Sequence, residues 1–226
     1  MARFIGSDLN TGNWAEDFFI QKLLEYFDFD DSYIIYRNRI VFGTEFDVAL
    51  LIPDCGIVIF EVKGWVPDTI LHVENGDKIV IRTKDENGAE GDKRENPYAQ
   101  ARGYMFHMER RIRSKTNKDP LIYVMTCFPN LTVQDYLNKG MEPVCEPETT
   151  LLKEDLSSRE AFHNKMELCR TNQKRKAHNK SPFTKELMYS VRQIFEGQLK
   201  IEDPTVEDTN LVEGTDPPGK PAYSIL

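Results

Sequence analysis

The stretch Phe46–Trp65, FDVALLIPDCGIVIFEVKGW, constrains the fold more than any other part of this 226-residue chain. Two strongly apolar runs flank a Pro-Asp-Cys-Gly break, a pattern typical of a β-hairpin whose strands lie in the middle of a sheet. Both runs nevertheless carry charge, with Asp47 in the first and Glu61 and Lys63 in the second. Charged groups in buried strands cost free energy unless they are compensated. The sequence therefore predicts a central hairpin that contains a compensated charged site.

The register of this hairpin decides whether the three charges meet. Glu61 and Lys63 are two residues apart in a strand, so their side chains leave the same face. If Ile52 opposes Gly56 around a short loop, Asp47 falls opposite Glu61, and directly opposed residues share a face. A slip of one residue would separate the two acids. We therefore expect all three charges together at one end of one face of the sheet.

Two chemical interpretations compete for this charged set. Two carboxylates on adjacent strands are hard oxygen ligands of the kind that Mg²⁺ or Mn²⁺ prefers, and a lysine beside them can orient water or stabilise charge on a phosphorane. Alternatively, Lys63 forms an internal salt bridge with Glu61, Asp47 or Glu45. The register also places Glu45 across from Lys63, which makes it a lesser candidate for the site. The apolar context and the shared face favour the metal site.

Further candidate residues lie on two expected helices. Glu16 shares the apolar stripe of a helix expected over 13–27 and should point toward the edge of the core. It could equally close a capping box with Asn13. Gln100 and Tyr104 stand at i and i+4 of a helix that is expected to begin at the segment ENPY and to run to about Ser114, so they share a face. They either hold a nucleotide or the attacking water, or they simply pack.

The remaining patterns alternate between strands and helices, which predicts an α/β domain. A strand is expected over 33–39 and the central hairpin over 40–52 and 56–63. A second hairpin is expected over 69–83 with an Asn75-Gly76 turn, followed by a polar loop over 84–95. A buried strand is expected at LIYVMTCF, and a helical region over 157–196 that is interrupted near Pro182. Residues 1–200 are expected to form one domain, with a core at about 12–129 and a helical extension at about 155–197. The segment 201–226 is expected to be an acidic linker with Pro and Gly, and its last residues, AYSIL, look like the start of a strand in a longer chain.

The charge distribution bears on possible partners. The formal net charge of −8 argues against a general nucleic-acid binder, but Arg102–Lys118 carries six basic residues against one acid and Arg170–Lys180 carries five against none. Solvated helix faces explain such runs equally well. The candidate contacts to nucleic-acid phosphates are Arg102, Arg110, Arg111, Arg113, Lys174, Arg175 and Lys176.

Several other classes of protein are disfavoured. The N-terminus lacks an apolar signal core and no run approaches the length of a membrane span, so we expect a cytoplasmic protein. The four cysteines are scattered without a CxxC motif, which favours a reduced compartment and gives little support to an iron–sulfur site. The histidines His72, His107, His163 and His178 lack zinc-ligand spacing. A Gly-rich phosphate loop, the mark of many nucleotide-binding proteins, is missing from the sequence.

Taken in order, the segments GNWAEDFF, EFDVALL, GIVIFEVKGW and NPYAQARGY resemble the nuclease-related domain (NERD) family, a branch of the PD-(D/E)XK nuclease superfamily. The resemblance covers about residues 12–129. It implies a restriction-endonuclease-like α/β/α core with a mixed central β-sheet, followed here by the C-terminal helical region and the acidic linker. It also implies metal ligation by Asp47, Glu61 and the backbone carbonyl of Val62, a catalytic role for Lys63, Glu16 as the helix acid, and Gln100 with Tyr104 as an accessory motif.

The function implied by this resemblance is Mg²⁺- or Mn²⁺-dependent hydrolysis of phosphodiester bonds in DNA or RNA. Family members are often joined to a helicase, and some of these fusions act against phage, so a helicase domain in a longer chain is an implied partner. The alternative function is a non-catalytic module of a helicase that binds nucleic acid or docks a partner. It predicts binding without a metal requirement and no cleavage product.

Overall fold

The computed structural model describes residues 2–6, 13–28, 31–41, 44–84, 88–176 and 179–197. Two sheets organise this part of the chain, a mixed six-stranded sheet and a smaller antiparallel one. The larger sheet contains, in spatial order, β1 (Arg3–Ile5), β2 (Ile34–Val41), β3 (Thr44–Ile52), β4 (Gly56–Val62), β8 (Ile122–Cys127) and β9 (Thr150–Leu151). The smaller sheet contains β5 (Ile70–Glu74), β6 (Lys78–Lys84) and β7 (Glu90–Glu95).

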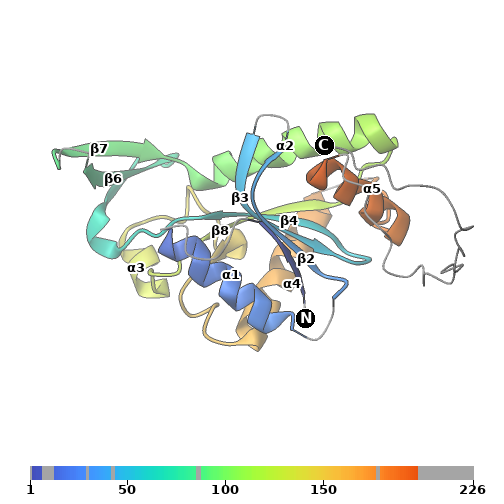
Figure 1. Cartoon of the computed structure of the whole chain (residues 1–226). Helices are drawn as coiled ribbons and strands as arrows, with labels where there is room; N and C mark the ends of the chain where they lie inside the picture. The colour runs from blue at the N-terminus through green and yellow to red at the C-terminus, as the bar shows by residue number, and fades with distance from the viewer. Residues whose placement is uncertain are drawn as a thin grey trace, which may run out of the picture.

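Helices cover both faces of the larger sheet (Figure 1). They are α1 (Trp14–Tyr26), α2 (Pro97–Thr116), α3 (Val133–Asn138), α4 (Arg159–Lys176) and α5 (Lys185–Glu196), with short 3₁₀ turns η1 (Pro67–Thr69) and η2 (Pro147–Thr149). In Figure 1, α2 and α5 lie above the sheet, whereas α1 and α4 lie below it. The expected α/β/α core with a mixed central sheet is confirmed.

The central hairpin has the predicted register. Ile52 pairs with Gly56 and Val48 pairs with Phe60, and β4 runs parallel to β8 on its other side. Gly56 is required at the turn because its φ is +149° and a Cβ there would lie 2.3 Å from the carbonyl oxygen of Leu121. Every residue of β4 is buried, as expected for a strand in the middle of a covered sheet.

Alternate residues of the hairpin enter two separate cores. Val48 and Phe60 pack into the core between the sheet and helices α1 and α4. Ala49 and Ile59 pack into the core between the sheet and helices α2 and α5. Because side chains alternate between faces along a strand, Asp47, Glu61 and Lys63 belong to the α2 side of the sheet. The register thus decides which helices can reach the charged set.

Two sequence predictions about the strands are wrong. The segment expected as one strand over 40–52 is divided, since Ile40 and Val41 belong to β2 and Val41 pairs with Thr44 of β3. The apolar pattern of the sequence continues from β2 into β3, so periodicity did not reveal this division. The loop expected over 84–95 contains strand β7, whose polar residues are exposed and pair with β6. An exposed edge strand needs no apolar face, so no such pattern marked it.

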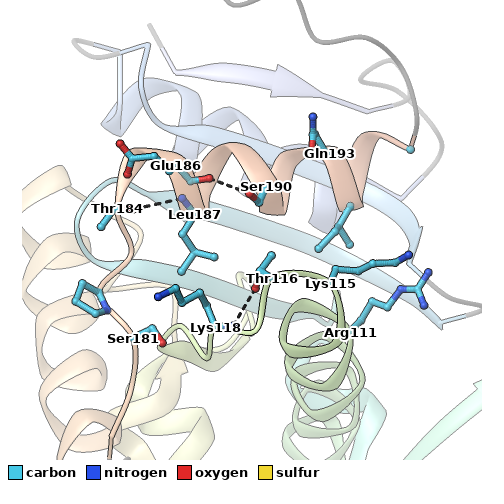
Figure 2. Close-up of a pocket in the computed structure, with 13 residues that line it drawn as sticks. Arg111, Lys115, Thr116, Lys118, Ser181, Thr184, Glu186, Leu187, Ser190 and Gln193 are labelled. Carbon is cyan, nitrogen blue, oxygen red and sulfur yellow. Dashed lines mark hydrogen bonds between the residues drawn. The ribbon is translucent and has the colours of Figure 1, made fainter.

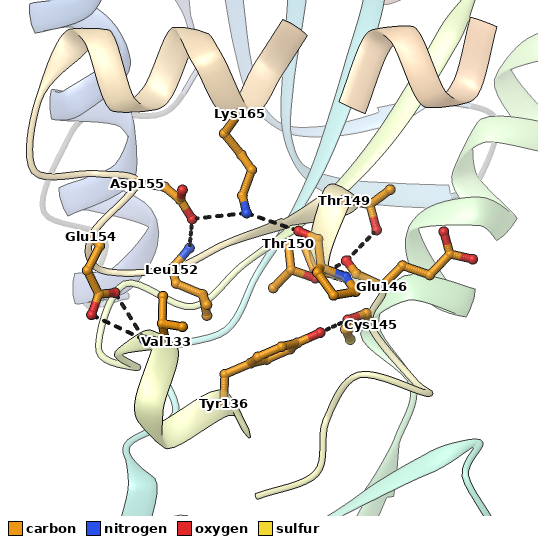
Figure 3. A network of polar contacts seen from close by, with 12 residues as sticks. Val133, Tyr136, Cys145, Glu146, Thr149, Thr150, Leu152, Glu154, Asp155 and Lys165 are labelled. Carbon is orange, nitrogen blue, oxygen red and sulfur yellow. Dashed lines mark hydrogen bonds and ion pairs between the residues drawn. The ribbon is translucent and has the colours of Figure 1, made fainter. Parts of the chain in front are cut away.

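The segment between β8 and α4 is held by a network of polar contacts (Figure 3). Lys165 of α4 donates a 3.0 Å hydrogen bond to the carbonyl of Pro147 and lies 3.6 Å from Asp155. Asp155 accepts a 2.9 Å bond from the backbone N–H of Leu152, and the hydroxyl of Tyr136 donates to the carbonyl of Cys145. These contacts tie α3 and α4 to the segment around η2, at the β9 edge of the sheet.

The helical region expected near the C-terminus consists of α4 and α5, and Pro182 lies in the break between them, as predicted. The segment 198–226, which contains the predicted linker, lies outside the described residues. The domain bounds therefore stay a prediction. Among the described helices, none combines the length and the apolar composition that a membrane crossing requires.

Candidate active site

Asp47 lies where the ladder between β3 and β4 ends. The last backbone pair is Val48 with Phe60, and one step further the Asp47 carboxylate accepts a 2.8 Å hydrogen bond from the backbone N–H of Val62. On the other side, the register between β2 and β3 skips the pairing of Asp47 with Asn38, whose φ is +45°. Asp47 thus lies at an interruption of both neighbouring ladders, with its carboxylate hydrogen-bonded to β4.

Glu61 is the most deeply buried acid of the site. Its side chain is 0% exposed, and its Oε1 lies 2.7 Å from Nζ of Lys63. In the described part of the chain, the Lys63 ammonium is the partner of Oε1, and the buried Oε2 has no hydrogen-bond partner. The predicted contact between Lys63 and Glu61 is observed. Glu45 is exposed and is not among the ion-pair partners of Lys63, so that alternative is wrong.

A residue that the sequence did not single out completes the lysine's surroundings. Glu95, at the end of β7, places Oε2 3.0 Å from Nζ of Lys63. The chain leaves the site after Lys63, forms the small sheet, and returns to the site at Glu95. The sequence signal for Glu95 was an acid directly before the Asn96-Pro97 start of α2. It was missed because residues 84–95 were predicted to form a loop.

Burial, with a smaller contribution from nearby acids, raises the pKa values of both carboxyls. Burial raises the pKa of Asp47 to about 6, opposed by the hydrogen bond from Val62. Burial, then the charge of Asp47, raises the pKa of Glu61 to about 7, opposed by Lys63. Burial disfavours the Lys63 ammonium, but Glu61 and Glu95 outweigh it and keep the pKa above its usual value. One lysine thus leaves this pair of acids under-neutralised.

These residues fit a small divalent cation. In the described ranges, no group of three or more His, Cys, Asp or Glu residues is arranged as a metal site. Mg²⁺, however, is commonly held by one or two carboxylates and keeps several waters, so Asp47 and Glu61 suffice for it. The buried Oε2 of Glu61, which has no hydrogen-bond partner among the described residues, is the observation that favours a cation here. Ligation by the Val62 carbonyl stays a prediction.

Gln100 and Tyr104 reach the site from α2. The Oε1 atom of Gln100 accepts a 3.5 Å hydrogen bond from Nζ of Lys63, and its Nε2 donates a 2.6 Å bond to the Tyr104 hydroxyl. Burial raises the pKa of Tyr104, and the hydrogen bond from Gln100 opposes this rise. The negative charges of Glu61 and Asp47 raise the pKa further by a smaller amount. The structure therefore brings Gln100 and Tyr104 together with the acids and the lysine.

Glu16 occupies the opposite face of the sheet. It is buried, as predicted, and its Oε2 accepts a 3.2 Å bond from Arg37. Because Arg37 pairs with Val48, its side chain lies on the α1 face. The alternative interpretation, a capping box with Asn13, is wrong, since the Asn13 side chain makes no cap bond and instead donates to the Glu16 carboxylate. Glu16 acts on Asp47 through its charge, which raises the pKa of that carboxyl.

The strand end after Lys63 is anchored from two directions. Asn130 donates a 3.0 Å hydrogen bond to the carbonyl of Gly64, and the rings of Trp65 and Phe128 lie 5.6 Å apart. A Cβ at Gly64 would lie 3.1 Å from that of Ala15, so α1 presses closely against this turn. These contacts limit how far the Lys63 backbone can move.

The predicted phosphate-binding residues of α2 do not share one face. Gln100, Tyr104 and Arg111 follow one flank of the helix, because i, i+4 and i+11 positions are aligned. Arg113 lies on the other flank and is 2.5 Å from Asp119. Arg102 also lies there, over the Phe106 ring at 5.4 Å. Of the arginines Arg102, Arg110, Arg111 and Arg113, the helix period aligns Arg111 with the active-site residues.

The predicted basic residues of α4 lie apart from this flank. Lys174 is exposed near the end of α4, and its neighbour Gln173 bonds to the backbone of Val124 in β8. The side chains of Arg175 and Lys176 lie outside the described residues. Their contact with nucleic acid stays a prediction.

The raised pKa of Glu61 makes a prediction about stability. Between its ordinary pKa of 4.5 and about 7, the folded state binds more protons than the unfolded state, so stability falls as pH rises. In chelator, we expect the free energy of unfolding to contain a contribution from Glu61 that is about 2 kcal/mol smaller at pH 8 than at pH 5.5. Urea denaturation of the native and Glu61→Gln proteins at both pH values isolates this contribution, because the other titrating groups cancel. Equal pH dependence in the two proteins would contradict the assignment.

Comparison with known proteins agrees with this geometry. The family described as "Nuclease-related domain" matches residues 11–129, slightly more than half of the chain, and this range contains Asp47, Glu61, Lys63, Gln100 and Tyr104. No curated protein matches the chain, and no solved structure does so either. With its mixed sheet and its charged hairpin end, the chain belongs to the nuclease-related domain family.

Proposed function

We propose that this protein is a Mg²⁺- or Mn²⁺-dependent nuclease that hydrolyses phosphodiester bonds of nucleic acid, with DNA as its principal substrate. One observation carries the proposal. Two carboxylates of raised pKa, Asp47 and Glu61, lie beside Lys63, and the buried Oε2 atom of Glu61 has no hydrogen-bond partner in the described part of the chain. A structural salt bridge would not need a second acid there, whereas a divalent cation would stabilise both.

In the proposed reaction a divalent metal ion, when bound, would supply Lewis-acid chemistry and an activated water at neutral pH. Asp47 and Glu61 would be the ligands of this metal ion. Lys63 remains protonated between Glu61 and Glu95, so its ammonium can stabilise negative charge that develops on the phosphate. The Tyr104 hydroxyl accepts from Gln100, which leaves its own proton available to donate to a phosphate oxygen.

The association with a helicase and a role in anti-phage defence rest on the family resemblance. The family match supports a nuclease-related activity and a nucleic-acid substrate. We propose that the protein is the nuclease part of a nuclease–helicase system. Co-purification of a helicase with the tagged natural protein, followed by stimulation of cleavage by ATP, is the expected result.

A second function is favoured by one feature of the site. Lys63 already has two acidic partners, Glu61 and Glu95, and such a closed set of charges is also typical of a structural ion pair. This geometry suits a module that binds nucleic acid without cleaving it. The two functions differ in their need for metal, so cleavage measured with Mg²⁺, with Mn²⁺ and with chelator separates them.

Replacement of Lys63 tests the proposal. We expect Lys63→Met to lower the cleavage rate by a factor of about 100 to 1,000, because it removes the cation that faces the phosphate. The assay uses linear, circular, single-stranded and double-stranded DNA and RNA, so it also identifies the substrate. Native protein should cut in Mg²⁺ or Mn²⁺ and stop in chelator.

The matched control is Lys93→Met, which removes an exposed lysine paired with the same acid, Glu95, at 2.7 Å. This variant should cleave at nearly the native rate. Absence of any metal-dependent product from native protein, with nucleic acid still bound, would support the non-catalytic function instead. Cleavage by Lys63→Met at the native rate would show that a contaminating nuclease or another site is responsible.

A further inference from the structure

A cavity of about 780 Å³ lies between the C-terminal half of α2 and helix α5, away from the active site (Figure 2). Three of its lining residues are cationic and come from α2 or the turn after it, namely Arg111, Lys115 and Lys118. Arg111 and Lys115 stand at one end of the cavity and Lys118 at the other, while α5 forms the facing wall. Glu186 is the one acid among the lining residues. The cavity therefore carries a net positive charge.

Polar groups suited to an anion line the opposite wall. Thr184 caps α5 and accepts from the backbone N–H of Leu187 at 3.3 Å, so the positive end of the helix dipole borders the cavity. Ser190 and Gln193 follow on the next turns of the same helix. The Ser190 hydroxyl already donates to the carbonyl of Glu186 at 3.0 Å, so the cationic side chains across the cavity are the principal donors for phosphate oxygens.

The lysines of this cavity are not neutralised by the acids near them in sequence. Glu109 and Asp119 pair with Lys180 and Arg113 on the other flank of α2. In the part of the chain that the structure describes, Lys115 and Lys118 have no ion pair. Basic residues often stabilise the C-terminal dipole of a helix, but Lys118 lies beyond α2 and so is not explained in this way.

The cavity lies on the same flank of α2 as the proposed catalytic residues. Gln100, Tyr104, His107, Arg111 and Lys115 follow positions i, i+4, i+7, i+11 and i+15, which run along one side of a helix. At a rise of about 1.5 Å per residue, Gln100 and Lys115 are roughly 22 Å apart. Six or seven nucleotides of one duplex strand, at about 3.4 Å each, span this length.

We propose that this cavity binds a backbone phosphate of the nucleic-acid substrate, about six nucleotides from the bond that is cut. The proposal rests on the proposed function for the identity of the ligand. Lys115 and Lys118 contact the phosphate, and Arg111 continues the path toward the active site. Such a contact does not depend on sequence, weakens with salt, and requires a strand long enough to reach from one site to the other.

The test measures binding in chelator, so it does not depend on cleavage. The probes are fluorescein-labelled DNA oligonucleotides: a single-stranded 20-mer, a double-stranded 20-mer and a single-stranded 4-mer. Binding of each probe to the full chain is measured by fluorescence anisotropy. For Lys115→Glu/Lys118→Glu we expect about 10- to 100-fold weaker binding of the 20-mers and less than about 2-fold change for the 4-mer. The slope of log affinity against log salt should fall by about 1.5.

Two matched variants isolate the position of the charges. Lys78→Glu/Lys153→Glu makes the same change in net charge at two exposed lysines outside the cavity and should bind the 20-mers nearly as the native protein does. Lys115→Arg/Lys118→Arg keeps the charge and should retain affinity. Equal losses in the two Glu double variants, or equal losses for both probe lengths, would overturn the proposal.

The outcome separates this proposal from the proposed nuclease function. Length-dependent binding through the cavity without any metal-dependent cleavage would leave the phosphate site intact and refute the nuclease. If the Lys115→Glu/Lys118→Glu protein binds 20-mers with native affinity and still cleaves them in the presence of metal, the nuclease function is supported and the phosphate site is refuted.

Discussion

Asp47→Asn and Glu61→Gln are each expected to reduce metal-dependent cleavage by at least about 1,000-fold while the protein stays folded. Each substitution removes one of two carboxylates that converge on the proposed metal position and keeps the size of the side chain. Neither should destabilise the protein in chelator at pH 8, because each removes a buried charge that burial and a neighbouring acid already disfavour. Cleavage under single-turnover conditions and thermal unfolding of the same samples measure both effects.

Metal binding provides an independent check on this pair. Mg²⁺ or Mn²⁺ should raise the unfolding temperature of the native protein, since a ligand of the folded state stabilises it, but not that of Asp47→Asn. The rise should be larger at pH 8 than at pH 5.5, because the carboxylates must lose their protons to bind the ion. The matched control is Glu45→Gln, which removes a nearby exposed acid and should keep both cleavage and the metal response. Native-like cleavage by both site variants would contradict the proposed function.

Arg37→Leu is expected to cause the largest loss of stability in the chain, about 3–5 kcal/mol. The Arg37 side chain is 0% exposed, and its guanidinium lies 3.2 Å from Glu16 and 2.5 Å from Asp17. Removal of the arginine leaves a buried carboxylate at Glu16 without its cation. For a domain of about 200 residues, the unfolding temperature should fall by about 10 °C or more.

An exposed ion pair supplies the control for this prediction. Arg94→Leu removes a guanidinium that lies 2.8 Å from Glu74 at the surface, and it should leave the unfolding temperature nearly unchanged. Addition of Glu16→Gln to Arg37→Leu should restore part of the lost stability, because the stranded carboxylate is then neutral. A single Arg37→Leu protein as stable as the native one would show that these buried charges are compensated elsewhere.

The central hairpin could be predicted from local sequence because several independent signals agree there. Apolar residues on both faces require a covered strand, and the Pro-Asp-Cys-Gly loop with its obligatory Gly56 admits one register. Two of the four segments that carry the family resemblance belong to this hairpin, so the family and the mixed sheet were predicted together. The polar edge strand β7 and the division between β2 and β3 escaped prediction, since neither is marked by a change in the apolar pattern.

The sequence by itself determined that two acids and a lysine would gather at one end of a buried hairpin, because the strand period of two ties side-chain direction to register. The tertiary structure alone decided which other groups meet them. Packing of the small sheet brings Glu95 to Lys63, the rotation of α2 presents Gln100, Tyr104 and Arg111 on one flank, and Arg37 holds Glu16 on the opposite face. These contacts join segments far apart in the chain, and their geometry depends on how whole elements pack, which no local periodicity encodes.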